Sequence, residues 1–350
     1  EHLYTEAKAE NVPVVFLSVL RQFRQPSEGP RTVFLDQALN LPECHRFVEV
    51  FKRVAPESSS ALAKLLHKPM SQRTPFQFAL TAFGRDYIGI TPYVESRLDV
   101  ATDSQREILT YLALAYYYGH KALLSQVFAS YLGHPEHIPL RFEKILQQPQ
   151  LELLVEDNGQ KWRPAHQLIA EEILRVVLSG ASGDRRNWKR NLPEWAIDFI
   201  RICRRGVQTP SDDLIDLLRR VFILRDEHEL LGTESAGLSH FAHLIEDIPT
   251  DEGKLSVLQE LVNLFPKEAH FWGHLGRFYS IAMQEYEHAL EAISRAIQLC
   301  PEDPVLHHMK GMCHRERAKA RMRQLRRAEP AVEDILEVRD TVDKALETFA

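Results

Sequence analysis

The sequence predicts a mainly α-helical protein built from several domains. Three observations support this fold class: helical spacing of apolar residues through most of the chain, strand-like runs limited to the N-terminal end and one hairpin, and a repeat of paired helices in the C-terminal half. With 350 residues, 44% of them hydrophobic and 26% charged, the chain can bury a sizeable core and does not have the composition of a disordered protein.

Charge, cysteine content and hydropathy indicate which partners and which compartment suit this sequence. The net charge of −6 argues against nucleic-acid binding over a large surface. The cysteines form no CxxC motif and no disulfide framework, which indicates a reducing compartment, and no apolar run is as long as a membrane span. We therefore expect a cytoplasmic protein that does not enter a membrane. Because the sequence opens at Glu1 without a methionine and closes within a helical pattern, we also expect a piece of a longer chain.

Residues 1–38 are expected to contain the last strands of an α/β domain. VPVVFLSVLR (residues 12–21) is a β-branched, nearly continuous apolar run, as in a strand buried on both faces of a parallel sheet. RTVFL (residues 31–35) is a second, shorter run. Since two strands do not make such a sheet, the rest of it should lie on the N-terminal side.

Residues 39–100 are expected to form a separate helical domain. Prolines should interrupt its helices at four places, namely Pro56, Pro69, Pro75 and Pro92. The first helix has an apolar face at spacings i, i+3, i+4 and i+7, formed by Phe47, Val50, Phe51 and Val54.

Residues 101–180 predict a winged-helix domain. Three helical patterns (ILTYLALAYYYG, ALLSQVFASYLG and IPLRFEKIL) precede LELLVEDNGQKW, in which two short apolar runs flank Asn158-Gly159. Asn-Gly supplies the positive φ of a two-residue type I′ hairpin turn. Three helices followed by a hairpin is the element order of a winged helix.

A further helix should begin near His166, directly after the hairpin. As a helix, this segment places His166 on one face with five apolar residues, namely Ile169, Ala170, Ile173, Val176 and Val177. A titratable ring at the start of an apolar face is either a structural histidine or a ligand-facing one, and the pattern alone leaves both open.

Residues 181–350 predict a helical repeat array. SGASGDRRNWKR reads as a polar linker, and helical patterns follow it. Within EAHFWGHLGRFYS and EYEHALEAISRAIQLCP, residues stand at the spacings of a tetratricopeptide (TPR) motif, with one extra residue in the turn between the two helices: Trp272, Leu275, Gly276, Tyr279, Ala289, Ile293, Ala296 and Pro301. Partial copies flank it, with Leu258, Leu261 and Pro266 before and Gly311 after. A large residue fills the gap between paired helices, small residues allow close approach, and proline stops the second helix.

The order of these segments resembles the regulatory part of STAND-type ATPases (signal transduction ATPases with numerous domains). VVFLSVLR followed by RTVFLDQALNLPECHRFVEVF is similar to the C-terminal part of their ATPase core, with Arg21 as the sensor arginine. SQRTPFQFALTAF resembles the segment behind the adenine, with Pro75 as the nucleotide-facing proline. RPAHQLIAEEIL resembles the end of the winged helix, although only His166 of the family's Met-His-Asp triplet matches.

The resemblance implies a nucleotide-binding core ending at residue 38, a helical lid at 39–100, and ADP or ATP bound in the complete protein by residues that include Arg21, Pro75 and His166. HFWGHLGRFYS and VLHHMKGMCHR are most similar to the TPR region of animal sterile-alpha-motif antiviral proteins and of related bacterial defence proteins. A role in antiviral or innate-immune signalling, protein partners on the TPR-like region, contact with the upstream ATPase core and self-association on activation are the corresponding expectations.

The chain departs from the family in what catalysis needs. No G-x-x-x-x-G-K-[ST] motif occurs, and EGKL around Gly253 lacks both the upstream glycine and the Ser or Thr. Without that loop there are no converging amides and no lysine for the phosphates. We therefore expect no hydrolysis of nucleotide by this chain alone.

Simpler explanations exist for each candidate. Arg21 can be a solvated strand-end arginine, Pro75 the first residue of a helix, and His166 a structural histidine. The cluster His307, His308, Cys313 and His314 fits a repeat helix better than a zinc site, because its spacing does not bring enough ligands onto one face. The basic run RERAKARMRQLRRA is expected to pair with neighbouring acids, and DNA binding by the winged helix is not expected, because the segment before the hairpin offers only Arg141 and Lys144.

Two hypotheses of different classes remain. The first is a regulatory and sensor segment of a STAND-type signalling ATPase that couples nucleotide state to protein interaction and oligomerisation. The second is a helical scaffold whose TPR groove binds protein or peptide partners without any nucleotide role.

Overall fold

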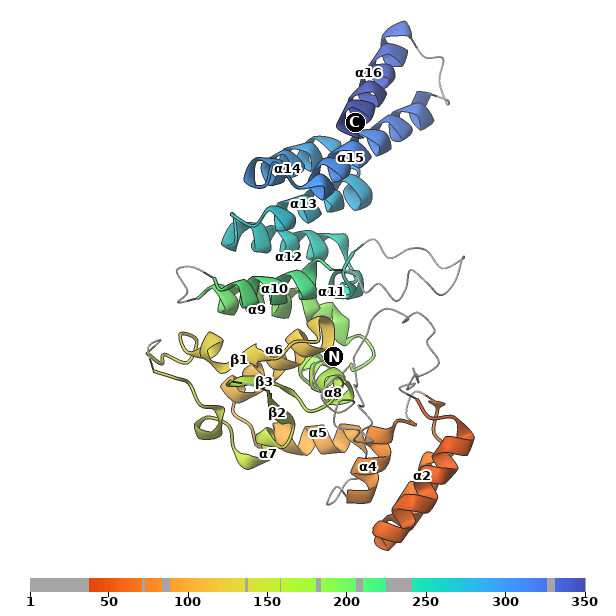
Figure 1. The fold of residues 1–350 in the computed structure, drawn as a ribbon, viewed down its shortest axis with the longest axis vertical. Helices are drawn as coiled ribbons and strands as arrows, with labels where there is room; N and C mark the ends of the chain where they lie inside the picture. The colour runs from red at the N-terminus through yellow and green to blue at the C-terminus, as the bar shows by residue number, and fades with distance from the viewer. Residues whose placement is uncertain are drawn as a thin grey trace, which may run out of the picture. The chain divides into compact units, whose positions relative to one another are not determined.

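The computed structural model of the chain describes residues 38–349 except 71–72, 84–88, 136–137, 158, 181–183, 206–209, 225–240 and 326–330. The two N-terminal strands predicted at residues 12–21 and 31–35, and with them Arg21, lie outside the described residues. Within the described part, 15 α-helices and one small three-stranded sheet confirm the mainly α-helical class (Figure 1).

A small helical core is built from α2 (Leu41–Val54), α3 (Ser59–Leu65) and α4 (Pro75–Phe83). Helix α2 starts with a capping box in which Asn40 and Glu43 satisfy each other's backbone N–H groups. Its buried residues are Cys44 and Val48, with Phe47 and Phe51 half-buried beside them.

The apolar face predicted for α2 is wrong in part, because Val50 and Val54 are 56% and 64% exposed. The true contact stripe runs through Cys44 and Val48, on the other side of the two phenylalanines. Helical spacing alone fits either stripe, and packing against α3 and α4 selects one.

Helix α5 (Ile90–Asp99) begins before Pro92 and continues through it, so the interruption predicted there is wrong. Pro92 is the third residue of the helix. In the first turn the backbone N–H groups have no partner within the helix, so a proline costs no hydrogen bond there.

A three-stranded antiparallel sheet follows the long helix α6 (Asp103–Gly119). Its strands are β1 (Leu123–Leu124), β2 (Leu154–Asp157) and β3 (Lys161–Pro164), in the order β1-β3-β2. The second of the three helices predicted before the hairpin is therefore replaced at its start by a strand and a 3-10 turn (Ser125–Phe128). The third, predicted over residues 138–146, is reduced to a 3-10 turn (Phe142–Lys144), and the one-turn helix α7 (Gln148–Leu151) follows it. Pairing with β3 overrides the local helical pattern of Leu123 and Leu124.

The hairpin loop has three residues, not the two predicted. Asp157 pairs with Lys161, and the positive φ angles fall on Gly159 (74°) and Gln160 (66°). Asn158 lies outside the described residues. A three-residue loop that ends in the left-handed region is the next common hairpin type after the type I′ turn.

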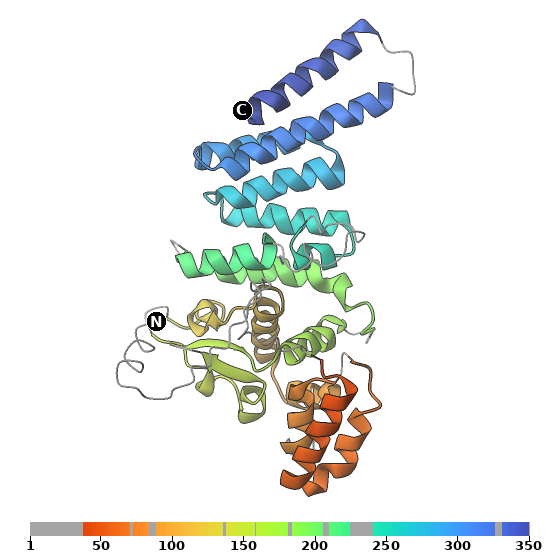
Figure 2. The same ribbon diagram turned by 45° about the vertical axis from the view of Figure 1, so that its right-hand side comes forward.

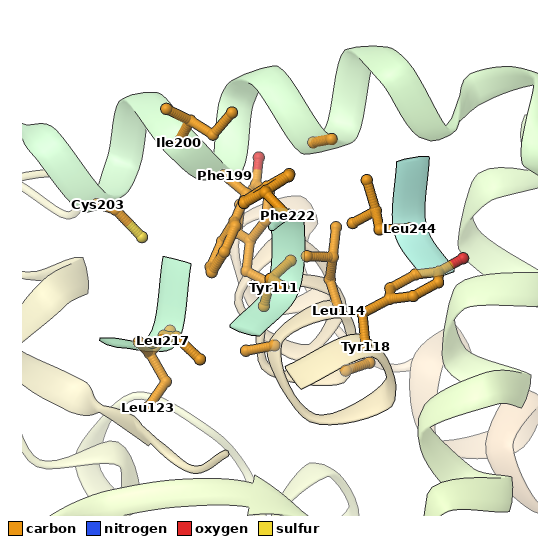
Figure 3. Close-up of a cluster of buried hydrophobic side chains, with 14 of the residues drawn as sticks. Tyr111, Leu114, Tyr118, Leu123, Phe199, Ile200, Cys203, Leu217, Phe222 and Leu244 are labelled. Atoms are coloured by element: carbon orange, nitrogen blue, oxygen red, sulfur yellow. The ribbon is translucent and has the colours of Figure 1, made fainter. Parts of the chain in front are cut away.

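The largest core runs without a break across the boundary predicted at residue 180. It joins α6 and α8 (Gln167–Leu178) to α9 (Leu192–Arg204), α10 (Asp212–Phe222) and α11 (His243–Asp247). Figure 3 shows Tyr111 and Leu114 of α6 pointing towards Phe199 of α9 and Phe222 of α10. The predicted linker contains Trp188, which is 5% exposed in a 3-10 turn (Trp188–Asn191) that leads into α9, so this part of it is packed.

Five helices follow one another from α12 onward, each packed on the next. They are α12 (Asp251–Leu264), α13 (Ala269–Phe278), α14 (Tyr286–Leu299), α15 (Pro304–Leu325) and α16 (Val332–Phe349). Figures 1 and 2 both show them side by side in chain order. In the described part of the chain, no helix combines the length and the apolar character that crossing a membrane would require.

Candidate functional site

His166 is the N-cap residue of α8. Its backbone is extended (φ −151°, ψ 155°), and its Nδ1 accepts a hydrogen bond from the N–H of Leu168 at 3.2 Å. Its carbonyl oxygen accepts from the N–H groups of Ile169 and Ala170, at 3.0 and 3.1 Å. An imidazole nitrogen that accepts a hydrogen bond carries no proton, so this bond is made by the tautomer that has its proton on Nε2.

The ring of His166 stacks on the ring of Phe76, with centroids 4.0 Å apart and planes 6° apart. Phe76 is the second residue of α4 and directly follows Pro75, which begins that helix. Thr74 caps α4, since its hydroxyl accepts from the N–H of Gln77 at 3.2 Å. The structure thus brings together two of the three segments predicted to bind nucleotide, although they lie far apart in the sequence.

The position of the His166 ring differs from that of a ligand-facing histidine at an open helix start. A ligand-facing histidine at the start of α8 would have its ring beside free backbone N–H groups, where an anion binds favourably. Instead the ring turns back onto its own helix and packs on Phe76, and the N–H groups of Leu168, Ile169 and Ala170 already have partners. The ring therefore caps its own helix and packs on a phenylalanine, and it does not form an open cradle for an anion.

The helix that carries His166 is held rigidly. Ile169 and Ile173 are 1% and 0% exposed, and both belong to the largest core. The sequence pattern identified these two contacts correctly, whereas it did not single out Phe76. Nothing in the local sequence around a phenylalanine indicates that a distant histidine packs on its ring, so only the tertiary structure shows this contact.

The predicted repeat residues meet between α13 and α14. A Cβ atom on Gly276 would lie 2.6 Å from Cγ1 of Ile293 and 2.8 Å from the carbonyl oxygen of Ala289, so only glycine allows the two helices to come this close. Ala289 and Ala296 are fully buried, and Leu275 is 4% exposed. These small and apolar residues form the contact between the paired helices.

The remaining repeat residues lie at the edges of this contact. Trp272 is half-buried, and its Nε1–H donates to the carbonyl oxygen of Pro266 at 3.0 Å. The hydroxyl of Tyr279 accepts from the side chain of Gln259 of α12 at 3.0 Å. Pro301 follows the end of α14, and Gly311 is buried within α15. The fully buried aromatic residues of α13 are instead Phe271 and Phe278, which the motif did not single out.

The extra residue in the repeat has a structural counterpart. Residues Tyr279–Met283 form a π-helical turn, after which Gln284 adopts the left-handed conformation (φ 57°). A π turn holds about one residue more than an α-helical turn, so it absorbs an insertion without separating the helices.

A small cavity of about 220 Å³ lies between α6 and α9. Several of its polar residues are already engaged: the Tyr131 hydroxyl donates to Glu107, and Arg201 pairs with Glu260 at 2.7 Å and with Asp198 at 3.2 Å. Burial and the bond to Glu107 raise the pKa of Tyr131 to about 12. Its lining carries two carboxylates, Glu107 and Asp198, and two arginines, Arg201 and Arg205, so the side-chain charges of the cavity favour neither an anion nor a cation.

Two other predictions concern charged residues and metal ligands. In the basic run of α15, Arg317 pairs with Glu287 at 2.9 Å and Arg321 with Asp334 at 2.6 Å, so these cations have acidic partners, as expected from the sequence. Among the described residues, no three His, Cys, Asp or Glu side chains come close enough together to hold a metal ion.

Comparison with known proteins does not assign the chain to a family. The sequence matches no protein-family model, and no curated protein is similar to it in sequence.

Proposed function

We propose that this chain is the regulatory segment of a STAND-type signalling ATPase of cytoplasmic antiviral or innate defence. In this proposal α2 to α5 form the helical lid, residues 101–180 the winged helix, and the helices from α9 onward a TPR-like array. The observation that carries the proposal is the stack of His166 on Phe76, which joins the segment after Pro75 to the N-cap of α8. In a STAND protein, these two segments face the same nucleotide.

The sheet supports the winged-helix assignment. The short strand β1, after the first long helix, pairs with strand β3 of the hairpin, and α8 follows directly on β3. Such a sheet holds the wing against the helices even where 3-10 turns stand in place of the second and third helices. His166 then lies at the end of the wing, where β3 passes into α8.

The role we propose for His166 is to donate a hydrogen bond through Nε2 to a phosphate oxygen of bound ADP. The hydrogen bond of Nδ1 with Leu168 keeps the proton on Nε2, and Phe76 holds the plane of the ring. A hydrogen bond to a charged acceptor contributes about 1.5–3 kcal/mol. It would hold the winged helix in a resting state, and its loss would favour an open, self-associating form with protein partners on the helical array.

The test is the ADP affinity of the complete protein with His166→Asn. Asparagine is a good N-cap residue, so α8 keeps its cap while the imidazole is lost. We expect ADP to bind roughly 10- to 100-fold more weakly, as the loss of one charged hydrogen bond implies. Ile169→Ala is the control, because it should lower stability and leave ADP affinity unchanged. Equal ADP affinity in His166→Asn and the unsubstituted protein would show that His166 is structural.

This chain should not hydrolyse ATP by itself, since it carries no phosphate-binding loop. Incubation of the chain with ATP should release no phosphate above the blank. Turnover that disappears on a single substitution in the chain would contradict the proposal.

The second candidate is a helical scaffold without a nucleotide role. The close contact of α13 and α14 at Gly276 favours it, because paired helices of this kind build protein-binding grooves without any ligand. The two candidate functions predict different sequences before Glu1. A phosphate-binding loop and an acidic Walker B strand within about 200 residues before Glu1, one domain length, would favour the ATPase, and their absence the scaffold.

A further inference from the structure

Helix α16 has one face that is covered by α15 and an apolar face that is exposed. Thr341 and Ala345 are 8% and 5% exposed and face α15. The side chains of the opposite face are large, apolar and exposed: Val332 (68%), Ile335 (54%), Leu336 (54%), Val342 (36%) and Leu346 (62%). An apolar stripe along a whole helix, unlike single exposed residues, indicates an interaction surface.

Four of the five exposed residues have the spacing of a coiled-coil seam, and Leu336 lies beside it. Val332, Arg339 and Leu346 follow one another at intervals of seven residues. Ile335 lies three residues after Val332, and Val342 lies three residues after Arg339. These are the a and d positions of a heptad repeat, which keep one seam facing a partner helix. The stripe therefore suits another helix lying alongside it better than a flat surface or an extended peptide.

One position of the seam is charged, and its charge has a partner nearby on the same helix. Arg339 is 76% exposed, and its Nε lies 3.8 Å from Oδ2 of Asp343, which is 57% exposed. This pair is loose, and in water it contributes little. If a partner covered the seam, the guanidinium would need a close carboxylate, because an unpaired charge in an interface is costly. A partner that presents an acid near the centre of α16 would supply this carboxylate.

We propose that the partner is α16 of a second copy of this chain, in antiparallel orientation. When Arg339 of one copy lies opposite Val342 of the other, Leu346 lies opposite Ile335, so the apolar layers match on both sides of the centre. Asp343 of the second copy then lies one position from Arg339, and the two-fold axis forms this ion pair twice. Parallel pairing would instead place Arg339 against Arg339, which like-charge repulsion disfavours.

The size of the seam sets the strength of the pairing. An α-helix of 18 residues is about 27 Å long, so the contact is smaller than a standard protein interface. We expect a reversible dimer with a dissociation constant on the order of micromolar. The inference does not rest on the nucleotide role of His166, and it would hold equally for a helical scaffold.

The first experiment is sedimentation of the 350-residue chain at roughly 1 to 200 µM. The unsubstituted chain should shift from monomer to dimer, and Leu346→Asp should weaken the dimer at least about tenfold. Val50→Asp is the matched control, since Val50 is 56% exposed on α2, far outside the seam, and should leave the dimer unchanged. Circular dichroism should show equal helical content in all three. A chain that stays monomeric over this range would overturn the proposal.

A charge exchange tests the antiparallel register separately. Arg339→Asp and Asp343→Arg should each weaken the dimer several-fold, because each places like charges opposite one another across the two-fold axis. The double variant restores an opposite-charge pair, so it should recover most of the affinity. A dimer that neither single variant weakens, or that the double variant does not restore, would exclude this pairing even if the chain dimerises elsewhere.

Discussion

The imidazole ring of His166 lies parallel to the phenyl ring of Phe76, at a centroid distance of 4.0 Å. Phe76 belongs to α4, whose buried residues lie in the small helical core, whereas α8 is part of the largest core. The stack therefore joins two cores that are formed by separate parts of the sequence.

We predict that the contact contributes measurably to stability. In a double-mutant cycle with Phe76→Leu and His166→Asn, the coupling energy should be about 0.5–1.5 kcal/mol, the range of aromatic pairs. Urea denaturation followed by circular dichroism measures it, and Asn keeps the cap of α8 so that only the stack is lost. Additive effects of the two substitutions would mean that the rings touch without stabilising the fold.

Gly276→Ala should destabilise the helical array by about 1–3 kcal/mol, because its methyl group would collide with Ile293 and the backbone of Ala289. Gly273→Ala on the same helix is the control. Its methyl group would lie 2.9 Å from Leu306 and 3.3 Å from Met309, both ends of flexible side chains that can move. A thermal or urea melt in which the two variants lose equal stability would argue against a special approach of α13 and α14 at Gly276.

Phe271→Ala should cost more than Trp272→Ala, against the order that the repeat motif predicts. Phe271 is fully buried, so its loss should cost about 3–5 kcal/mol, whereas Trp272 is half-buried and should cost less. In an array of nearest-neighbour contacts, hydrogen exchange should rise first between residues 250 and 315, before the region around α8. Uniform loosening of the whole chain would contradict a repeat array.

The pairing of α15 and α16 should weaken in mild acid. Burial, together with the positive charges of Lys310, Arg317 and Lys344, lowers the pKa of His314 below its ordinary value of 6.5, and only Asp340 opposes this. Between the lowered pKa and 6.5, the unfolded chain binds the proton more readily than the folded one. The contribution of His314 to stability is therefore present above pH 6.5 and is lost as the pH falls through the pKa of the folded state.

Urea denaturation at about pH 7.5 and 5.5 measures this dependence. His314→Leu should reduce the loss of stability in acid, because leucine does not titrate. His288→Gln is the control, since it removes a histidine whose side chain is 62% exposed. An unchanged loss in His314→Leu would assign the acid sensitivity to other groups.

The sequence by itself determined the features that depend on neighbours along the chain. The mainly helical class, the start of α4 at Pro75, the start of α8 next to His166 and the helix pair around Gly276 follow from spacing, caps, glycines and prolines. Each of these is encoded within one or two turns, where side-chain sterics and backbone hydrogen bonds act locally.

Only the tertiary structure decided the features that depend on residues far apart. Leu123 and Leu124 became a strand because β3 offers them a partner, Val50 and Val54 stayed exposed because α3 and α4 pack on the other stripe, and the core continued past residue 180. The contact of Phe76 with His166 is of the same kind. Local patterns fit several arrangements about equally well, and burial against distant segments selects one of them, because that is where most of the folding free energy is gained.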